Sequence, residues 1–352
     1  MTIGLGVTLF PLARATAGQA VLAFQGEVGA LDDEPTQVLT VTASIFLPLV
    51  VVPEAVEDDG IPFATKSRYM ATTEWVNLFG MGCEDGQVVP SDENTAVILD
   101  FGQPWSSDGA YGTLLFMVYQ FRSTTQIAEA VKGYLDGFYL CAPEGAHTRV
   151  AVGTNNYGMW TTYQHGVAWA EMVNGLNEWI ADQPGYESKV AARGASDMEP
   201  GFREPVSTRA WVNGYNAAFS GESWLYNFGS CDGCPYAGCP TCTSPNGWTR
   251  EDVWYVSYGP AANWPFPEIY LTSGIHADQW YRISVYSHDY HGGRMHFLGT
   301  LTQWGACQTY GPCNGTDNTP EEGWQQLQEK LNADERTAQP VIYSSDISWP
   351  PE

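Results

Sequence analysis

The sequence predicts an α/β protein built on a (β/α)8 TIM-like barrel, incomplete or decorated in places, that follows an N-terminal extension. Between residues 96 and 332, short apolar runs alternate six times with helical patterns. This alternation indicates a parallel sheet covered by helices. Polar or aromatic residues follow nearly every apolar run, and the active sites of such barrels lie where the strands end. An open doubly wound sheet is the alternative, but no G-x-G-x-x-G follows the first strand, so dinucleotide binding is not supported.

The repeating units can be followed along the chain. In the first expected helix, Ile127, Val131 and Leu135 recur at four-residue spacing, which is typical of an amphipathic helix. A closed barrel needs two more units, which we expect in residues 60–95 and in divergent segments. The expected strands are 96–102, 149–156, 189–199, 224–229, 268–272 and 294–302, and the expected helices are 125–139, 165–181, 208–219, 250–258, 277–286 and 321–332.

The chain divides into four expected parts: a signal-peptide-like segment at 1–20, an N-terminal extension at 21–95, the barrel at 96–335 and a C-terminal tail at 336–352. The first part joins an apolar run to an A-x-A-like cleavage pattern but lacks a basic region, and a plain N-terminal strand is its alternative reading. A second apolar run, 38–52, is interrupted by Pro48 and is too short for an integral membrane span. Export to the cell surface or the medium is therefore expected.

Charge limits the partners that this chain can bind. It has 352 residues and carries 40 acidic against 15 basic side chains, a net charge of −25. Such a chain is repelled by phosphate backbones, so we expect no nucleic-acid partner. With 44% hydrophobic and 16% charged residues it is globular, and most of its 14 Trp and 19 Tyr are expected to fill cores.

Two carboxylates stand two residues apart in the segment Lys189–Phe202. Side chains alternate along a strand, so Asp197 and Glu199 are expected to point the same way. Their repulsion raises one pKa and leaves a general acid beside an anion, which is what cleavage of a glycosidic bond requires. Strand-end acids that cap the next helix or face water are the alternative interpretation.

The neighbours of the two acids differ. Pro200 follows Glu199 and has no backbone N–H, whereas Ser196 stands beside Asp197 as a hydrogen-bond donor. We therefore expect Glu199 to hold the proton and Asp197 to be the anion. Asp100, at the first strand end, is a third candidate catalytic carboxylate. The candidate substrate-binding residues at the other strand ends are Asn155, Asn156, Tyr226, Asn227, Tyr270, Gln303 and Trp304. No metal or cofactor is expected at this rim.

The segments VGTNNYG, GASDMEPGF, YNFGS and LTQWGAC, with Asp100, resemble the D-x-E muramidases of glycoside hydrolase family 25. They resemble more closely the bacterial, largely uncharacterised glycoside-hydrolase-like barrels related to these enzymes. The resemblance covers residues 96–335 and implies hydrolysis of a cell-wall or other polysaccharide, with Glu199 as the acid and Asp197 as its partner. Gln303-Trp304 replaces the Trp-x-Tyr-like ending that the family leads us to expect, and the cysteine loop is foreign to it. Retaining, inverting and substrate-assisted mechanisms stay open, as does a non-catalytic carbohydrate-binding barrel.

The eight cysteines form an even set. Cys231, Cys234, Cys239 and Cys242 stand as two C-x-x-C pairs, a pattern that in an intracellular protein predicts a zinc site and in an exported one predicts disulfides. Given the export-like segment we expect disulfides, with connectivity inside this loop left open. The other four cysteines are expected to pair as Cys83–Cys141 and Cys307–Cys313.

Overall fold

The computed structural model describes residues 60–234, 244–311, 313 and 318–350. The chain divides into two units, Met1–Asp58 and Asp59–Glu352, and the described residues belong to the second. The expected signal segment, the apolar run at 38–52 and the cysteines Cys239 and Cys242 lie outside the described residues.

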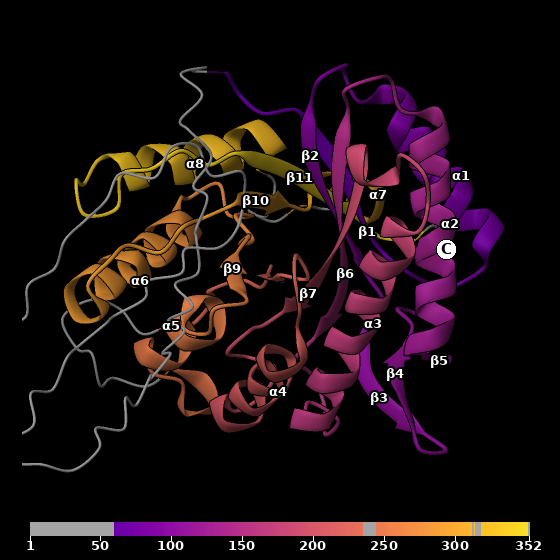
Figure 1. The fold of residues 1–352 in the computed structure, drawn as a ribbon. Coiled ribbons are helices and arrows are strands. Elements are labelled where there is room, and N and C mark those ends of the chain that lie inside the picture. The colour runs from indigo at the N-terminus through magenta and orange to yellow at the C-terminus, as the bar shows by residue number, and fades with distance from the viewer. Residues whose placement is uncertain (1–59, 235–243, 312, 314–317, 351–352) are drawn as a thin grey trace, which may run out of the picture. The chain divides into compact units, whose positions relative to one another are not determined.

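Eight parallel strands form a nearly closed barrel, which confirms the predicted TIM-like fold class (Figure 1). Their order around the sheet is β10-β11-β1-β2-β6-β7-β8-β9. Between the two outer strands of this order, the amide of Leu298 donates to the carbonyl of Pro265 at 3.0 Å, and Glu268 forms a parallel bridge with Leu301. The strands are β1 (Ala64–Tyr69), β2 (Asn94–Asp100), β6 (His147–Asn155), β7 (Val190–Asp197), β8 (Leu225–Asn227), β9 (Asn263–Pro265), β10 (Gly299–Thr302) and β11 (Tyr343–Ser348).

Helices surround the strands on the outside (Figure 1). Several begin at a hydroxyl residue that satisfies a free amide of the first turn: Ser123, Thr249 and Thr319 each take part in a capping box. The helices are α1 (Trp75–Val88), α2 (Thr124–Cys141), α3 (Tyr163–Ala181), α4 (Pro205–Ala218), α5 (Arg250–Tyr258), α6 (Ile275–His291), α7 (Trp304–Tyr310) and α8 (Pro320–Asn332), with the 3-10 turns Tyr186–Ser188 and Pro245–Gly247. A small antiparallel sheet of β3 (Gln103–Ser107), β4 (Ala110–Leu114) and β5 (Phe121–Ser123) is inserted between β2 and α2.

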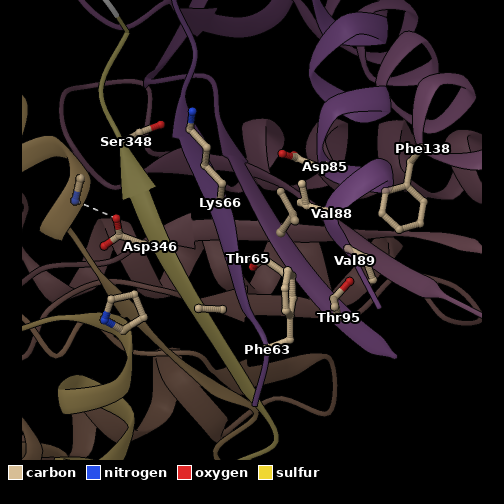
Figure 2. Close-up of a pocket in the computed structure, with 14 residues that line it drawn as sticks. Phe63, Thr65, Lys66, Asp85, Val88, Val89, Thr95, Phe138, Asp346 and Ser348 are labelled. Atoms are coloured by element: carbon tan, nitrogen blue, oxygen red, sulfur yellow. Dashed lines mark hydrogen bonds between the residues drawn. The ribbon is translucent and has the colours of Figure 1, made fainter. Parts of the chain in front are cut away.

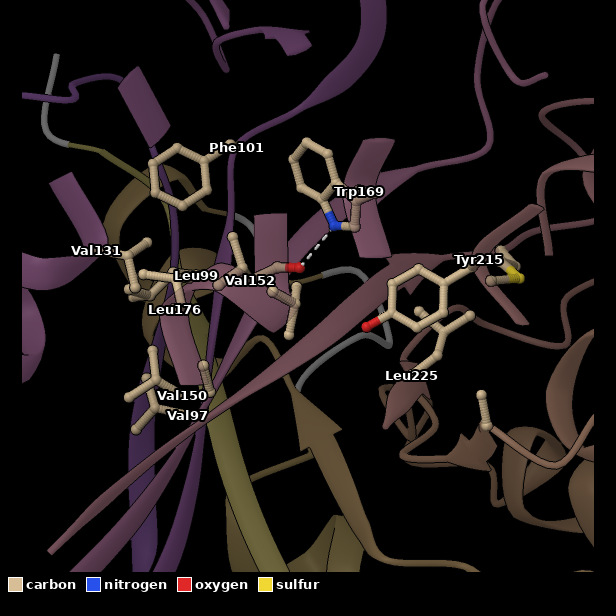
Figure 3. Close-up of a cluster of buried hydrophobic side chains, with 14 of the residues drawn as sticks. Val97, Leu99, Phe101, Val131, Val150, Val152, Trp169, Leu176, Tyr215 and Leu225 are labelled. Carbon is tan, nitrogen blue, oxygen red and sulfur yellow. Dashed lines mark hydrogen bonds between the residues drawn. The ribbon is translucent and has the colours of Figure 1, made fainter. Parts of the chain in front are cut away.

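The strands bury both faces. The outward side chains Val97, Leu99 and Val152 pack against the helices, where the indole of Trp169 donates to the carbonyl of Val152 at 3.0 Å (Figure 3). The inward side chains form a separate core inside the barrel. It comprises Ala96, Ile98, Ala151, Ala195, Tyr226, Phe228, Phe266, Leu301, Tyr343 and Ile347. Side chains above this inner core therefore point into the rim formed by the carboxyl ends of the strands.

The barrel is longer than the range 96–335 expected from the sequence, because β1 lies before it and β11 after it. Both strands are polar, and their hydroxyl groups bond one another inside the barrel. Thr65 donates to Ser345 at 2.8 Å, and the hydroxyls of Ser67 and Ser345 lie 2.6 Å apart. These contacts satisfy the buried oxygens, so neither strand needs the apolar run by which strands are recognised.

The strand expected at 268–272 lies elsewhere. The ladder of β9 covers Asn263–Pro265, and only the single bridge at Glu268 continues it. Pro265 and Pro267 have no amide hydrogen to donate, which interrupts regular pairing. Glu268 consequently stands at the end of this strand, at the rim of the barrel. The last expected strand is also shorter, covering Gly299–Thr302 of the expected 294–302.

Three disulfides close among the described cysteines. Cys83–Cys141 joins α1 to α2, and Cys307–Cys313 closes a short loop, so both expected pairs are confirmed. Cys231 pairs with Cys234, which takes two of the four thiols that a zinc site in this loop would need. No helix in the described part of the chain is long and apolar enough to span a bilayer.

A cavity of about 290 Å³ lies outside the barrel, beside β1, β11 and the helices α1 and α2 (Figure 2). Its lining includes Phe63, Lys66 and Val88. At its edge the carboxylate of Asp346 accepts the amide of Gly305 at 2.7 Å and so caps α7. Asp197 and Glu199, the two acids of the D-x-E segment (Asp197–Glu199), do not line this cavity. The cavity is therefore separate from the place where these acids lie.

Removal of the Cys83–Cys141 disulfide with two serines is expected to lower the free energy of unfolding by about 4 kcal/mol, because it closes a separation of 58 residues in the unfolded chain. The matched removal of Cys307–Cys313 opens a separation of only 6 residues and should cost about 2 kcal/mol. Urea denaturation without reductant measures both. Equal losses would contradict this dependence on loop length.

Candidate active site

Three carboxylates meet at the rim of the barrel. Asp197 ends β7 and follows Ala195 on the inward face, and Glu199 lies two residues further on. One side-chain oxygen from each of Asp197, Glu199 and Glu268 lies within 4.8 Å of the other two. The two acids of the D-x-E segment therefore point to one place, as the strand alternation predicts. We call Asp197, Glu199 and Glu268 the carboxylate triad.

Asp100 ends β2 at the same rim as the triad, two strands from Asp197. It follows Ile98 on the inward face and is only 1% exposed. Its Oδ1 accepts the amide of Gly102 at 2.9 Å, while its Oδ2 has no hydrogen-bond partner among the described residues. Its negative charge adds to the burial and the nearer charges that raise the pKa of Asp197 and of Glu268. Burial raises the pKa of Asp100 itself to about 7.

Burial is the main electrostatic influence on the triad. It holds the pKa of Asp197 and of Glu268 well above the usual range, and the charges of the neighbouring carboxylates raise both further. Burial also raises the pKa of Glu199, but the hydroxyl of Ser230 donates to its Oε1 at 2.6 Å and, with a backbone hydrogen bond, opposes the rise. Glu199 is therefore the triad member best stabilised as an anion.

This result reverses the expected division of roles between Asp197 and Glu199. The sequence suggests that Ser196 stabilises the Asp197 anion, yet Ser196 alternates to the other face of β7. Oδ1 of Asp197 is buried without a hydrogen-bond partner in the described structure. The serine that stabilises a carboxylate is Ser230, which comes from the loop after β8 and is remote in sequence from the D-x-E segment.

Two asparagines that we expected to bind substrate instead hold the D-x-E backbone. Asn156 donates from Nδ2 to the carbonyl of Glu199 at 3.1 Å and accepts the amide of Glu199 on Oδ1 at 3.1 Å. Asn227 accepts the amide of Gly229 at 3.1 Å and that of Met198 at 3.4 Å. A Cβ at Gly229 would lie 2.5 Å from the Met198 nitrogen, so this close approach requires glycine. Both asparagines are positioning residues.

The remaining expected substrate-binding residues occupy different places. Asn155 closes the turn after β6 by accepting the amide of Tyr157 at 3.0 Å. Tyr226 is a core residue, stacked on Phe266 inside the barrel with ring centroids 6.1 Å apart, so the substrate-binding role expected for it is wrong. Tyr270 follows Glu268 by two residues, and burial together with the charge of Glu268 raises the pKa of its hydroxyl.

Gln303 and Trp304 begin α7. Gln303 occupies the N-cap position of this helix without a side-chain cap hydrogen bond, and the amide of Trp304 donates to Asp346 at 2.7 Å. Both residues follow the carboxyl end of β10, so they lie at the rim where the sequence predicted them. A role for either side chain in binding substrate stays a prediction.

Sequence reasoning missed Glu268 and the aromatic residues next to the triad. Tyr69 ends β1 and stacks on Phe116 with centroids 4.5 Å apart, and Trp349 packs edge-on against both rings. Burial, followed by the charges of Glu268 and Asp197, raises the pKa of Tyr69, so its hydroxyl stays protonated. The rule that polar residues follow strands would have found Glu268 if the strand had been placed at 263–265.

A second aromatic pair lies beside the D-x-E segment. Tyr157, 53% exposed, packs edge-on against Phe202 with centroids 6.0 Å apart. Tyr157 follows the end of β6 and Phe202 comes three residues after Glu199. Together with Tyr69, Phe116 and Trp349 these rings give the rim apolar faces near its carboxylates.

Comparison with known proteins adds little to this geometry. Neither a family model nor a curated protein sequence matches the chain. Among solved structures, an endo-1,4-β-mannanase from Rhizomucor miehei is similar with a TM-score of 0.37 and 9% identity, over 81% of this chain and 84% of that chain. A likeness at this level does not bear on the assignment of the site. The resemblance to the D-x-E muramidases gains no support from these comparisons.

The carboxyl of Asp100 should make stability depend on pH. Its pKa is about 7 in the folded protein, against an ordinary value of 3.8 for an exposed aspartate, so the folded chain binds this proton more tightly than the unfolded chain does. Its favourable contribution is therefore complete below about pH 4 and is lost as the pH rises through about 7. At 1.36 kcal/mol per pKa unit, we expect Asp100→Asn to be more stable than the wild type at pH 8 by up to about 4 kcal/mol, and the difference to vanish near pH 4.

Urea denaturation between pH 4 and pH 8, with a chelator present, measures this difference. The exposed Asp182 supplies a matched control, and Asp182→Asn should change the pH dependence little. A stability difference between Asp100→Asn and the wild type that does not vary with pH would contradict the prediction.

Proposed function

We propose that this protein is a retaining glycoside hydrolase that acts on a cell-wall or other polysaccharide. The observation that carries the proposal is the short distance between the carboxylates at the barrel rim. Oxygens of Glu199 and Glu268 lie within 4.8 Å. Retaining enzymes hold their two carboxyl groups about 5–5.5 Å apart, whereas inverting enzymes need about 6.5–9.5 Å to admit a water between them. The geometry favours the retaining arrangement.

The electrostatics suggest a role for each carboxyl. Glu199, stabilised as an anion by Ser230, attacks the anomeric carbon, while the protonated Glu268 donates its proton to the leaving glycosidic oxygen. Water then cleaves the glycosyl–Glu199 ester, giving one proton back to Glu268 and the hydroxyl to the sugar. Burial, together with the charges of Glu199 and Asp100, keeps the pKa of Glu268 high enough for the first step. The carboxylate of Asp197, when ionised, would add a further negative charge near Glu268.

The aromatic residues at the rim support a sugar ligand. Sugar rings stack on aromatic faces, and Trp349 is 40% exposed beside Tyr69 and Phe116. Tyr157 and Phe202 offer a second apolar surface close to Glu199.

The disulfides support export. Three of them close among the described cysteines, and such bonds persist in oxidising compartments. We therefore propose a secreted or cell-surface location, where a polysaccharide substrate is accessible.

A non-catalytic carbohydrate-binding barrel is the second candidate function. The observation that favours it is the burial of the acids, since Glu268 is only 2% exposed. In this function the aromatic surfaces bind the glycan, and the triad does not meet the glycosidic bond.

Replacing either proposed catalytic glutamate should abolish hydrolysis. We expect Glu199→Gln and Glu268→Gln each to reduce kcat by at least about 10³-fold, because each removes a nucleophile or a proton donor. A panel of cell-wall and plant polysaccharides, with product analysis by mass spectrometry, supplies the activity measurement. The exposed Glu187 gives the control variant Glu187→Gln.

Azide separates the two roles. Added to Glu199→Ala it should give a glycosyl azide of inverted configuration, and added to Glu268→Ala one of retained configuration, because azide replaces the nucleophile in the first case and water in the second. Full activity of Glu199→Gln would contradict the role proposed for Glu199. Glycan binding by the wild type without hydrolysis of any polysaccharide in the panel would favour the binding-barrel alternative.

Truncating Trp349 should weaken substrate binding more than it slows the reaction. We expect Trp349→Ala to raise KM about tenfold, which corresponds to about 1.4 kcal/mol, while kcat changes little. Tyr290 is also exposed and stacks on Tyr286 in α6, so Tyr290→Ala is the matched control. A similar KM in both variants, or a collapse of kcat in Trp349→Ala alone, would contradict a binding surface at Trp349.

A further inference from the structure

Among the described residues, no basic side chain neutralises the carboxylates of the rim. Within the described ranges, no nitrogen of Lys, Arg or His lies within 4.0 Å of the carboxylates of Asp100, Asp197, Glu199 or Glu268. Residues 235–243 and 314–317 contain no Lys, Arg or His in the sequence. Uncompensated buried carboxylates are costly, so they keep protons or bind a cation.

The spacing of the triad suits one metal ion. Its three oxygens lie within 4.8 Å of one another. Ca²⁺ binds oxygen ligands at about 2.3–2.6 Å, so two ligands on opposite sides of one ion are at most about 5 Å apart. Three oxygens spaced evenly around one ion at 2.6 Å are about 4.5 Å apart, so the triad comes close to the spacing that one ion needs. Carboxylate oxygens are the ligands that Ca²⁺, Mg²⁺ and Mn²⁺ prefer.

A second observation concerns buried carboxyl oxygens without partners, one of them outside the triad. Asp100 is 1% exposed, and its inward-facing carboxyl keeps Oδ2 without a partner in the described structure. Oδ1 of Asp197, a residue 5% exposed, is likewise without a partner there. Buried carboxyl oxygens without a hydrogen bond are rare in folded proteins. Both belong to inward side chains at the ends of strands β2 and β7, on either side of β6.

The backbone around the triad is already fixed. Asn156 holds both backbone groups of Glu199, and Asn227 holds the amides of Met198 and Gly229. A site whose ligands are held in place loses little conformational entropy when an ion binds. The ion also removes the repulsion among the three carboxylates.

We propose that the carboxylate triad, with Asp100 beside it, binds one hard divalent cation of the Ca²⁺ class. This binding does not depend on the proposed hydrolase function. The two are linked only by shared atoms: an ion on the triad occupies oxygens that the hydrolytic steps need, so the ion-bound form is inactive and the ion inhibits hydrolysis.

Isothermal titration calorimetry on the full chain, after treatment with EDTA at pH 8, tests the proposal with CaCl2, MgCl2 and MnCl2 as the probes. We expect one site per chain. Asp197→Asn and Glu268→Gln should each weaken binding at least about a hundredfold, and Asp100→Asn should weaken it about 10–100-fold as a neighbour of the ligands. Glu187→Gln, at an exposed position, should bind as the wild type does.

Tb³⁺ luminescence keeps the test decisive if a variant does not fold. Tyr69 and Tyr270 lie close to the triad, so wild-type protein excited at its tyrosines should sensitise bound Tb³⁺, and Ca²⁺ should quench this emission by displacement. No heat of binding at millimolar concentrations of all three ions, together with no sensitised emission, would overturn the proposal.

Two further outcomes would also overturn it: binding that all three substitutions leave unchanged, and binding of glucosamine oligomers, a cationic sugar, when no metal ion binds. Loss of hydrolytic activity on every polysaccharide would contradict the proposed function and leave the cation site intact, because its test uses no substrate.

Discussion

The burial of several carboxylates at one end of a barrel is the constraint on which the rest of this site depends. Asp100, Asp197 and Glu268 are each no more than 5% exposed, and burial raises the pKa of all three. Such a group of acids destabilises the folded chain above neutral pH. It therefore persists only where the surrounding structure holds the backbone firmly, which the parallel barrel does by pairing its strand ends with their neighbours.

The loop after β8 explains why one acid differs from the others. Ser230 donates to Glu199, and its own oxygen accepts the amide of Asp232 at 3.3 Å. The next four residues form a turn that the Cys231–Cys234 disulfide closes. In this turn the amide of Cys234 donates to the carbonyl of Cys231 at 2.9 Å. The turn closed by this disulfide therefore follows directly after the serine that opposes the rise in the pKa of Glu199.

Sequence patterns predicted the parts of this protein that follow from periodicity. Alternation placed Asp197 and Glu199 on one side, and the six strand-and-helix units predicted the barrel. The patterns did not predict strands whose stability comes from contacts between residues far apart in the sequence. The strands β1 and β11 are polar because hydroxyls such as Ser67 and Ser345 bond across the interior, and no local pattern reveals that.

The same limit applies to the site. Glu268 reaches the rim because prolines end the pairing of β9 early, a shift of a few residues that propensity does not resolve. Ser230 contacts Glu199 across 31 residues of sequence, so a neighbour such as Ser196 was the natural but wrong choice. Local sequence indicated which residue types gather at strand ends, and the tertiary structure decided which of them touch.

The asparagines that hold the backbone around the triad are neutral amides, and the charges nearby give the reason. Asn156 must donate to one backbone group of Glu199 and accept from the other, which an amide can do and a carboxylate cannot. An aspartate at 156 would lose the donated bond and add a further negative charge to the group. A lysine or arginine would pair with the acids and lower their pKa, which would remove the proton that hydrolysis needs and compete with any bound cation. Asn156 and Asn227, which the sequence suggested as substrate ligands, therefore hold the backbone of the acids in place without adding charge.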